Sequence, residues 1–260
     1  AAAGTSEVTL LGQTVNAYGR ARPGQVEGEL AFADLIRRVA EIPGIRRIRF
    51  TSPHPRFVTP DLIRAFAEVP ELCPHLHLPV QSGSSRVLEA MSRRYDRETY
   101  LDVIDRVRKA RPGIAITTDL IVGYPTETEA DFEQTLTLMN EVRFTDSYSF
   151  KYSERPGTPA QRHRLGELDD ALVQARLERV QDLQRQLTLD AHGARVGKRT
   201  EVLVEGSSRH GSGQLTGRCP EHRVVNFNAT EPIELGSYLQ VEVTGCTPHS
   251  LLGVAVPGPS

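Results

Sequence analysis

Short apolar runs alternate with amphipathic segments along the first part of the chain. Runs of this length that are rich in Val, Ile, Leu and aromatic residues predict strands, and the segments between them predict helices. Strands that alternate with helices favour parallel β/α units, which we expect from residue 1 to 165. The predicted strands are 8–11, 47–51, 75–80, 114–122 and 146–152.

Residues that favour helix starts stand between these strands. Thr59 precedes Pro60, which is the pattern of an N-cap residue followed by proline in the first helical turn. Thr128 and Asp131 have the spacing of a capping box. The sequence therefore predicts that helices begin directly after these two threonines.

The pattern changes after residue 165. The segment 166–193 contains one long amphipathic stretch without proline, which predicts a connecting helix. From 194 to 260, short apolar runs are separated by glycines and polar turns, a pattern typical of a small β-barrel that binds single-stranded nucleic acid. The predicted strands of this barrel are 200–205, 213–218, 223–227, 238–244 and 251–256.

The expected fold class is therefore α/β, with parallel β/α units in 1–165 followed by a small all-β barrel in 194–260. A composition of 38% hydrophobic and 25% charged residues is that of a soluble globular protein. The formal net charge of -2 does not indicate a nucleic-acid partner. No apolar run approaches the roughly 18 residues of a membrane span, so we expect no membrane contact.

The cysteines are Cys73, Cys219 and Cys246, which lie far apart. An odd number without close spacing argues against a disulfide framework or an isolated zinc site, and it favours a reducing, cytoplasmic location. The first residues lack the basic and apolar regions of a secretion signal. We therefore predict a cytoplasmic protein without metal ligands of its own.

A polar turn follows the predicted strand 75–80. Gln81, Ser82 and Ser84 flank Gly83 there. At the carboxyl end of a parallel strand, such side chains and the nearby backbone amides point into the crevice where ligands bind. An ordinary strand-to-helix turn whose serines cap the helix is an alternative that this stretch alone leaves open.

Five sequence blocks, of which this turn belongs to the third, occur in a fixed order. They are EVTLLGQTVNAY at 7–18, SPHP at 52–55, HLHLPVQSGS at 75–84, TTDLIVGYPTET at 117–128 and FKYSERPGTP at 150–159. Together they resemble the radical S-adenosylmethionine (SAM) methylthiotransferases, and within them the tRNA 2-methylthio-adenosine synthases. The resemblance implies a partial radical SAM (β/α) barrel in 1–165 and a TRAM domain, an RNA-binding β-barrel, in 194–260.

The resemblance also implies S-adenosylmethionine as a cofactor. Gln13 and Asn16 offer uncharged donors and acceptors suited to its zwitterionic amino-acid part, although a purely structural turn is the alternative. Asp119 lies in an apolar run, where a carboxylate needs a partner such as a ribose hydroxyl, an amine or an arginine. The predicted cofactor-binding residues are Gln13, Asn16, Gln81, Ser82, Asp119, Gly123, Tyr152 and Arg155.

Three positions in these blocks leave alternatives open. His54 is a proton donor, a phosphate contact or a loop residue held between two prolines. Thr126 stands where the family has glycine, so either the turn needs no positive φ there or it is strained. Arg155 is suited to a carboxylate or an RNA phosphate, and a salt bridge at the neighbouring bend is the alternative.

Basic residues of the predicted small barrel are the candidates for binding tRNA. Glutamates close to them in sequence offset their charge, so binding needs the two signs on different faces. The predicted RNA-binding residues are Lys198, Arg199, Arg209, Arg218 and Arg223.

Members of the family hold a [4Fe-4S] cluster with three cysteines in a C-x-x-x-C-x-x-C loop, and a second cluster in an earlier domain. The cysteines of this chain are too far apart and too late in the sequence to replace them. The resemblance therefore implies the C-terminal part of a longer protein, whose N-terminal cluster-binding region is a missing partner. We predict a monomer that has no catalytic residue of its own and lacks the redox chemistry.

The function implied for the complete protein is transfer of a methylthio group to C2 of N6-isopentenyladenosine beside the anticodon of tRNA. S-adenosylmethionine would supply the radical and the methyl group, and an auxiliary [4Fe-4S] cluster the sulfur. One alternative is a related methylthiotransferase that acts on threonylcarbamoyl-adenosine or on a ribosomal protein. Another is a non-catalytic RNA-binding protein. A metabolic barrel enzyme is disfavoured because no glycine-rich phosphate loop stands late in the barrel.

Overall fold

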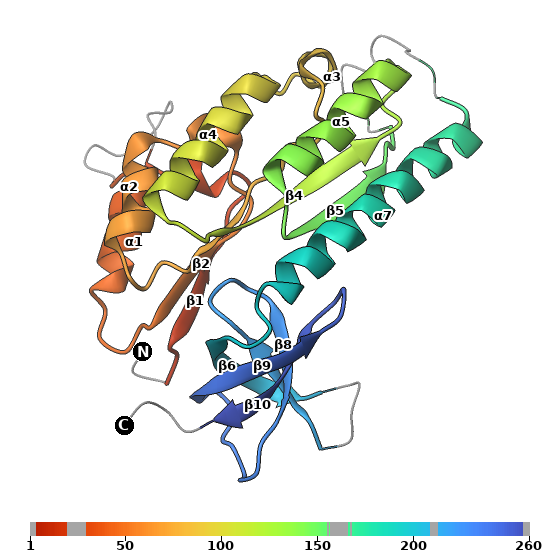
Figure 1. Ribbon diagram of the computed structural model, residues 1–260. Coiled ribbons are helices and arrows are strands. Elements are labelled where there is room, and N and C mark those ends of the chain that lie inside the picture. Colours follow the sequence, from red (N-terminus) through yellow and green to blue (C-terminus); the bar gives the residue numbers. More distant parts are fainter. Residues whose placement is uncertain are drawn as a thin grey trace. The chain divides into compact units, whose positions relative to one another are not determined.

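The computed structural model describes residues 4–19, 30–154, 156, 166, 168–208 and 213–256 (Figure 1). The chain divides into two compact units, Ala1–Gln184 and Arg185–Ser260. Their boundary falls within the long helix α7 (Asp170–Gly193), which matches the predicted connecting helix.

Two sheets of parallel strands form the framework of the first unit. One sheet pairs β1 (Glu7–Leu10) with β2 (Arg47–Phe50). The other has the order β3-β4-β5 and consists of β3 (His75–His77), β4 (Ala115–Val122) and β5 (Asp146–Lys151). All pairs within both sheets are parallel, so the predicted β/α units are confirmed.

The regular part of β3 is shorter than the predicted strand 75–80. Beyond His77, the N–H of Gln81 still donates to the carbonyl of Asp119 at 2.9 Å, and a bridge continues the pairing there. Pro79 lies between and has no N–H to donate, so the regular ladder ends early.

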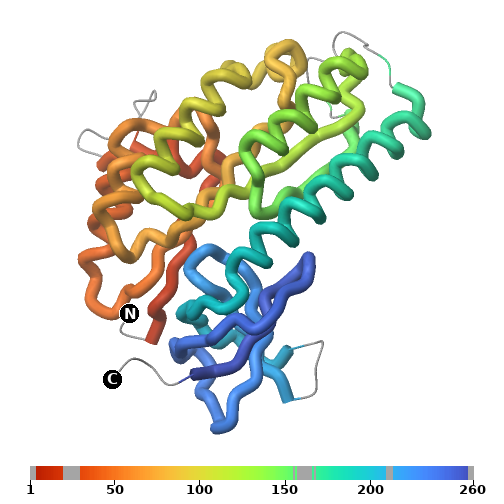
Figure 2. Tube along the Cα trace, in the orientation of Figure 1, coloured from red at the N-terminus to blue at the C-terminus, as the bar shows by residue number. Residues whose placement is uncertain are grey.

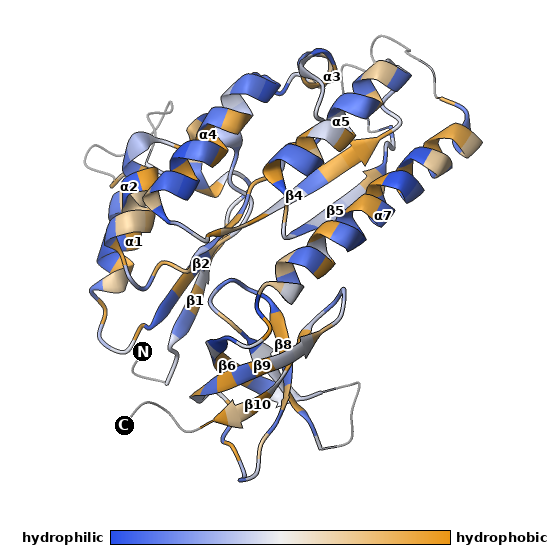
Figure 3. Ribbon diagram, in the orientation of Figure 1, coloured by the Kyte–Doolittle hydropathy of each residue, from blue (hydrophilic) through white to orange (hydrophobic). Residues whose placement is uncertain are grey.

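Helices follow the strands and carry both hydrophilic and hydrophobic residues (Figure 3). Thr59 Oγ1 accepts the N–H of Leu62 at 3.1 Å, and Thr128 forms a capping box with Asp131, so both predicted helix starts are confirmed. The helices are α1 (Phe32–Ala40), α2 (Pro60–Glu68), α3 (Ser85–Ala90), α4 (Arg97–Ala110) and α5 (Glu129–Val142), with short 3-10 helices η1 (Val15–Ala17) and η2 (Pro55–Phe57).

The second sheet has two different faces. In β4, the side chains of Ile116, Thr118, Leu120 and Val122 are buried, whereas the positions between them are partly exposed. In β5, every second residue from Asp146 onward is exposed. Because side chains alternate along a strand, one face of the sheet packs into the core and the other remains accessible.

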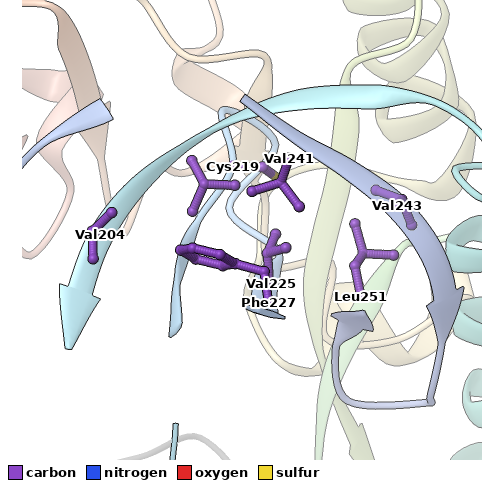
Figure 4. Close-up of a cluster of buried hydrophobic side chains, with 8 residues drawn as sticks. Val204, Cys219, Val225, Phe227, Val241, Val243 and Leu251 are labelled. Atoms are coloured by element: carbon purple, nitrogen blue, oxygen red, sulfur yellow. The ribbon is translucent and has the colours of Figure 1, made fainter. Parts of the chain in front are cut away.

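The second unit is a closed barrel with the strand order β10-β8-β7-β6-β9, coloured cyan to blue in Figure 2. Its strands are β6 (Arg199–Ser207), β7 (Leu215–Arg218), β8 (Val224–Asn228), β9 (Tyr238–Cys246) and β10 (Leu251–Val256). Buried side chains fill its interior (Figure 4): Val202, Val204, Cys219, Val225, Phe227, Val241, Val243 and Leu251. The predicted small β-barrel is confirmed.

Candidate functional site

Several predicted cofactor contacts lie just beyond the carboxyl ends of the parallel strands. Gln13 follows β1, Gln81 follows β3, Gly123 follows β4 and Tyr152 follows β5. The carboxyl ends of parallel strands in one sheet share an edge, which is where α/β proteins hold their ligands. The residues after β3, β4 and β5 therefore gather at one edge of the second sheet.

Asn16 has an internal role. It is 3% exposed, its Nδ2 donates to the carbonyl of His54 at 3.0 Å, and its Oδ1 accepts the N–H of His54 at 2.9 Å. Both ends of the amide are thus used to brace the loop after β2. Gln13, in contrast, is exposed. Burial, with Arg93 and Arg56 nearby, lowers the pKa of His54.

The turn after β3 serves mainly to begin α3. Ser82 is completely buried, and its Oγ accepts the N–H of Ser84 at 3.2 Å, so no ligand reaches it in this structure. Ser84 Oγ accepts the N–H of Val87 at 3.3 Å and donates to Asp131 at 2.6 Å, which confirms the capping alternative. Gln81 is 9% exposed and adopts a left-handed φ of 74°.

Asp131 joins this turn to the start of α5. Oδ1 of Asp131 accepts the hydrogen bond from Ser84, and Oδ2 accepts the N–H of Thr128 at 2.9 Å. The carboxylate also forms an ion pair with Arg86. Burial alone would raise the pKa of Asp131, but the hydrogen bonds from Arg86, Ser84 and Thr128 outweigh burial and hold the pKa well below its usual range. The ionised carboxylate is therefore a structural link between two helix starts.

A buried ion pair closes the turn after β4. The N–H of Gly123 donates to Glu127 Oε2 at 2.9 Å, and Arg176 of α7 lies 2.8 Å from the same oxygen. Burial raises the pKa of Glu127 despite Arg176. A Cβ at Gly123 would lie 2.6 Å from the side chain of Val173. The absence of a side chain at Gly123 therefore allows α7 to pack closely against the turn after β4. In this turn φ is positive at Gly123, at 78°, and not at Thr126, so of the two alternatives for Thr126 the structure favours a turn that needs no positive φ there.

A polar network lies on the accessible face of the second sheet. His77 Nε2 lies 3.5 Å from Asp119 Oδ1, and His77 Nδ1 lies 3.0 Å from Thr117 Oγ1. His75 Nε2 lies 3.2 Å from the same hydroxyl. The Asp119 side chain is 27% exposed. Asp119 therefore has a polar neighbour within the protein, a histidine rather than the ribose hydroxyl, amine or arginine named from the sequence, and its predicted contact with the cofactor stays a prediction.

Two aromatic side chains of β5 are exposed, although the sequence suggested only a backbone role for this segment, in which Phe150 to Tyr152 pair with an adenine edge. Tyr148 is 61% exposed and Phe150 is 52% exposed. Their spacing of two in a predicted strand, which places both on one face, was the available signal. Tyr152 instead packs edge-on against Tyr124 with 5.2 Å between ring centroids, and its buried hydroxyl has no hydrogen-bond partner among the described residues.

Three predicted RNA-binding residues lie at the surface of the small barrel. Lys198 is exposed. The Arg199 side chain is 60% exposed and lies 3.8 Å from Glu242. The Arg218 side chain is 33% exposed and lies 3.2 Å from Glu205. Both arginines therefore have a carboxylate neighbour that competes with an RNA phosphate.

Arg223 differs from these three residues. Its Nη1 donates to the carbonyl of Ala191 near the end of α7 at 3.3 Å, and burial lowers its pKa. A cation at a helix C-terminus stabilises the exposed carbonyls, so the structure gives Arg223 an internal role. Arg155 and Arg209 lie outside the described residues.

The cysteines do not fit an iron–sulfur cluster. Cys73 and Cys219 are buried, Cys246 is half-buried, and burial raises the pKa of the Cys219 thiol to about 11. Clusters are held by neighbouring thiolates, whereas the described residues contain no group of three or more His, Cys, Asp or Glu suited to a metal ion. Among the helices described, none is long and apolar enough to cross a membrane.

The fold and the sequence blocks define a class of protein. Residues 1–139 match the Radical SAM superfamily, and residues 193–256 match the TRAM domain. The chain therefore belongs to the radical SAM superfamily and carries a TRAM domain, as the resemblance predicted.

Within this class, the chain is similar to curated proteins named tRNA-2-methylthio-N(6)-dimethylallyladenosine synthase. The relative from Geobacter metallireducens is 50% identical over 256 residues, which cover 97% of this chain and 56% of the relative. The relative from Geobacter sulfurreducens is 50% identical over 98% of this chain and 56% of the relative. The relative from Mycobacterium ulcerans is 49% identical over 96% of this chain and 48% of the relative. The chain thus spans about half the length of the curated relatives it matches.

Proposed function

We propose that this chain forms the radical SAM barrel and TRAM portion of an enzyme that transfers a methylthio group to C2 of N6-isopentenyladenosine beside the anticodon of tRNA. The observation that carries the proposal is the 50% identity to a synthase of that name over 97% of the chain. This identity extends across both units, so it supports the same substrate class. The names of the relatives favour this substrate over threonylcarbamoyl-adenosine or a ribosomal protein.

S-adenosylmethionine fits part of the predicted residue set. Gln13 is exposed, and the buried Tyr152 hydroxyl has no protein partner among the described residues, so both have polar atoms available for a ligand. Asn16 and Ser82 are used internally. When bound, S-adenosylmethionine would supply the methyl group and the one-electron chemistry. Because the cysteines do not fit a cluster, we propose that the chain alone is inactive in that step.

The barrel of the second unit would bind the tRNA. Lys198, Arg199 and Arg218 are the surface cations that support this role, because phosphate contacts supply most of the affinity for nucleic acid. We propose a division into a partial radical SAM barrel at 1–165, a connector at 166–193 and a TRAM barrel at 194–260, acting as a monomer in the cytoplasm.

The proposed function is tested with a fusion. The N-terminal part of the Geobacter metallireducens relative is joined to this chain, the cluster is loaded anaerobically, and tRNA nucleosides are analysed by mass spectrometry. We expect 2-methylthio-N6-isopentenyladenosine from the fusion and none from the N-terminal part alone. Product only at threonylcarbamoyl-adenosine, or no product from a folded, cluster-loaded fusion, would overturn the proposal.

A further inference from the structure

The accessible face of β4 and β5 carries an aromatic ledge, which consists of Tyr148 and Phe150. Both side chains are more than half exposed, and they point to the same side because they are two residues apart on β5. Strand β4 lies beside β5 (Figure 1), and in the register of the sheet Asp119 is the neighbour of Tyr148 and Ile121 is the neighbour of Phe150. The ledge therefore has a carboxylate next to one ring and an aliphatic side chain next to the other.

Exposed apolar side chains that share one face of a strand are a candidate binding surface. Aromatic side chains are the platforms on which unpaired nucleobases stack, and each stacked base contributes about 1–3 kcal/mol. Stacking alone does not choose among bases. Selectivity has to come from polar groups beside the ledge.

The polar network of His75, His77 and Thr117 determines which hydrogen bonds the carboxylate of Asp119 can make. The hydroxyl of Thr117 contacts both His75 and His77, but it has only one proton to donate. If a neutral His77 carried its proton on Nδ1, the bare lone pair of Nε2 would face Asp119 Oδ1 at 3.5 Å, which is repulsive. The favoured arrangement has His75 Nε2–H donating to Thr117, Thr117 donating to His77 Nδ1, and His77 Nε2–H facing Asp119.

This arrangement leaves Asp119 as an oriented hydrogen-bond acceptor beside Tyr148. We propose that the ledge binds an unpaired N6-alkylated adenine of RNA, stacked on Tyr148 and Phe150, with its N6–H donating to Asp119. The alkyl substituent would contact Ile121. The inference rests on the proposed function and deepens it, and it assigns Asp119 to the RNA base in place of the cofactor contact predicted from sequence.

Stacking is tested with an anticodon stem-loop RNA that carries 2-aminopurine at the target position, titrated into the full chain; this fluorescent purine has no N6 group and therefore reports stacking on the rings without the contact to Asp119. Its fluorescence is expected to be quenched on binding. Phe150→Ala and Tyr148→Ala should each weaken binding roughly 5- to 150-fold and remove the quenching. Phe150→Tyr and Tyr148→Phe should keep both within about twofold. Leu172→Ala on α7 is the matched control, since Leu172 is also an exposed apolar residue.

The role of Asp119 is tested with two further RNAs. One carries an N6-monoalkylated adenosine, which retains one N–H, and the other an N6,N6-dialkylated adenosine, which has none. The full chain should prefer the monoalkylated RNA by about tenfold or more, because the dialkylated base would displace water from the half-buried Asp119 carboxylate without donating a hydrogen bond in its place. Asp119→Ala should remove this preference while leaving the quenching of 2-aminopurine in place.

The possible contradicting results are distinguishable. If the RNA binds without quenching, or if the ledge variants bind it normally, this inference is wrong and the proposed function stands. If the ledge variants lose S-adenosylmethionine in calorimetry and keep RNA, the ledge belongs to the cofactor and the inference is wrong. If sedimentation shows that the original chain is a dimer and that the ledge variants are monomers, the ledge is a dimer interface and the inference is wrong. If the chain binds no stem-loop RNA at all, the proposed function fails with it.

Discussion

Asn16 and His54 are separated by 38 positions in the sequence, yet the amide of the first makes two hydrogen bonds to the backbone of the second. An asparagine amide matches one backbone N–H and one carbonyl, so a single buried side chain satisfies both groups of a loop that has no regular structure. At the residue scale, this contact holds the loop after β2 against η1.

Replacing Asn16 by alanine should therefore lower the free energy of unfolding by about 1–3 kcal/mol, because two backbone groups of His54 lose their partner. The measurement is urea unfolding followed by circular dichroism. Gln13→Ala is the control, since that exposed neighbour should change stability by no more than about 0.5 kcal/mol. Equal losses in the two variants would contradict the bracing role of Asn16.

At the scale of elements, α7 is attached to the turn after β4 by Arg176 and Glu127, whose side chains are 4% and 0% exposed. Removing one partner of a buried ion pair leaves an uncompensated charge. Arg176→Met should cost about 3–5 kcal/mol of stability. Arg179→Met should cost less than about 1 kcal/mol, because Arg179 is 46% exposed in its pair with Glu129.

The same measurement in a Glu127→Gln background shows whether the charge causes the loss. Without a carboxylate to leave unpaired, Arg176→Met should cost clearly less there than in the original chain. An unchanged cost would assign the effect to packing of the arginine side chain.

Asp131 links the starts of α3 and α5, and its lowered pKa makes this link dependent on pH. A carboxyl group whose pKa is lower in the folded than in the unfolded state stabilises the fold above the unfolded value, here 3.8, and loses that contribution as pH falls through the folded value. The stability difference between the original chain and Asp131→Asn should therefore be largest at pH 6 and shrink toward pH 3. Thermal unfolding at stepped pH measures it, and a difference that is constant with pH would contradict the assignment.

At the scale of the whole molecule, a formal charge of -2 has to be reconciled with the proposed RNA partner. The structure shows surface cations of the barrel beside carboxylates, as in the pair of Arg218 and Glu205. Binding then depends on local contacts with phosphate rather than on net charge, and each such contact adds to the salt dependence of the affinity.

Arg218→Ala should weaken binding of an anticodon stem-loop RNA and reduce the slope of log affinity against log salt by about 0.7. Glu205→Gln should strengthen binding, because it frees the cation. Arg106→Ala on α4 is the control. Arg106 also has a carboxylate neighbour, at 3.2 Å, but it lies in the first unit and not in the small β-barrel. An unchanged slope for Arg218→Ala would remove this arginine from the RNA interface.

Much of the fold was predictable because its signals are local. The strands, the caps at Thr59 and Thr128, and the long helix each depend on patterns within a few residues. The regular part of β3 ends before the predicted strand 75–80 does, because Pro79 inside that apolar run has no N–H and interrupts the ladder.

The sequence alone determined the class of this protein, because five motifs in a fixed order are a linear property of the chain. Tertiary structure alone decided how individual polar groups are used. In the folded chain, Asn16, Ser82 and Arg223 make hydrogen bonds within the protein, whereas the ledge of Tyr148 and Phe150 remains accessible. Burial and hydrogen-bond partners are set by segments far apart in the sequence, so no local pattern reports which polar group remains available to a ligand.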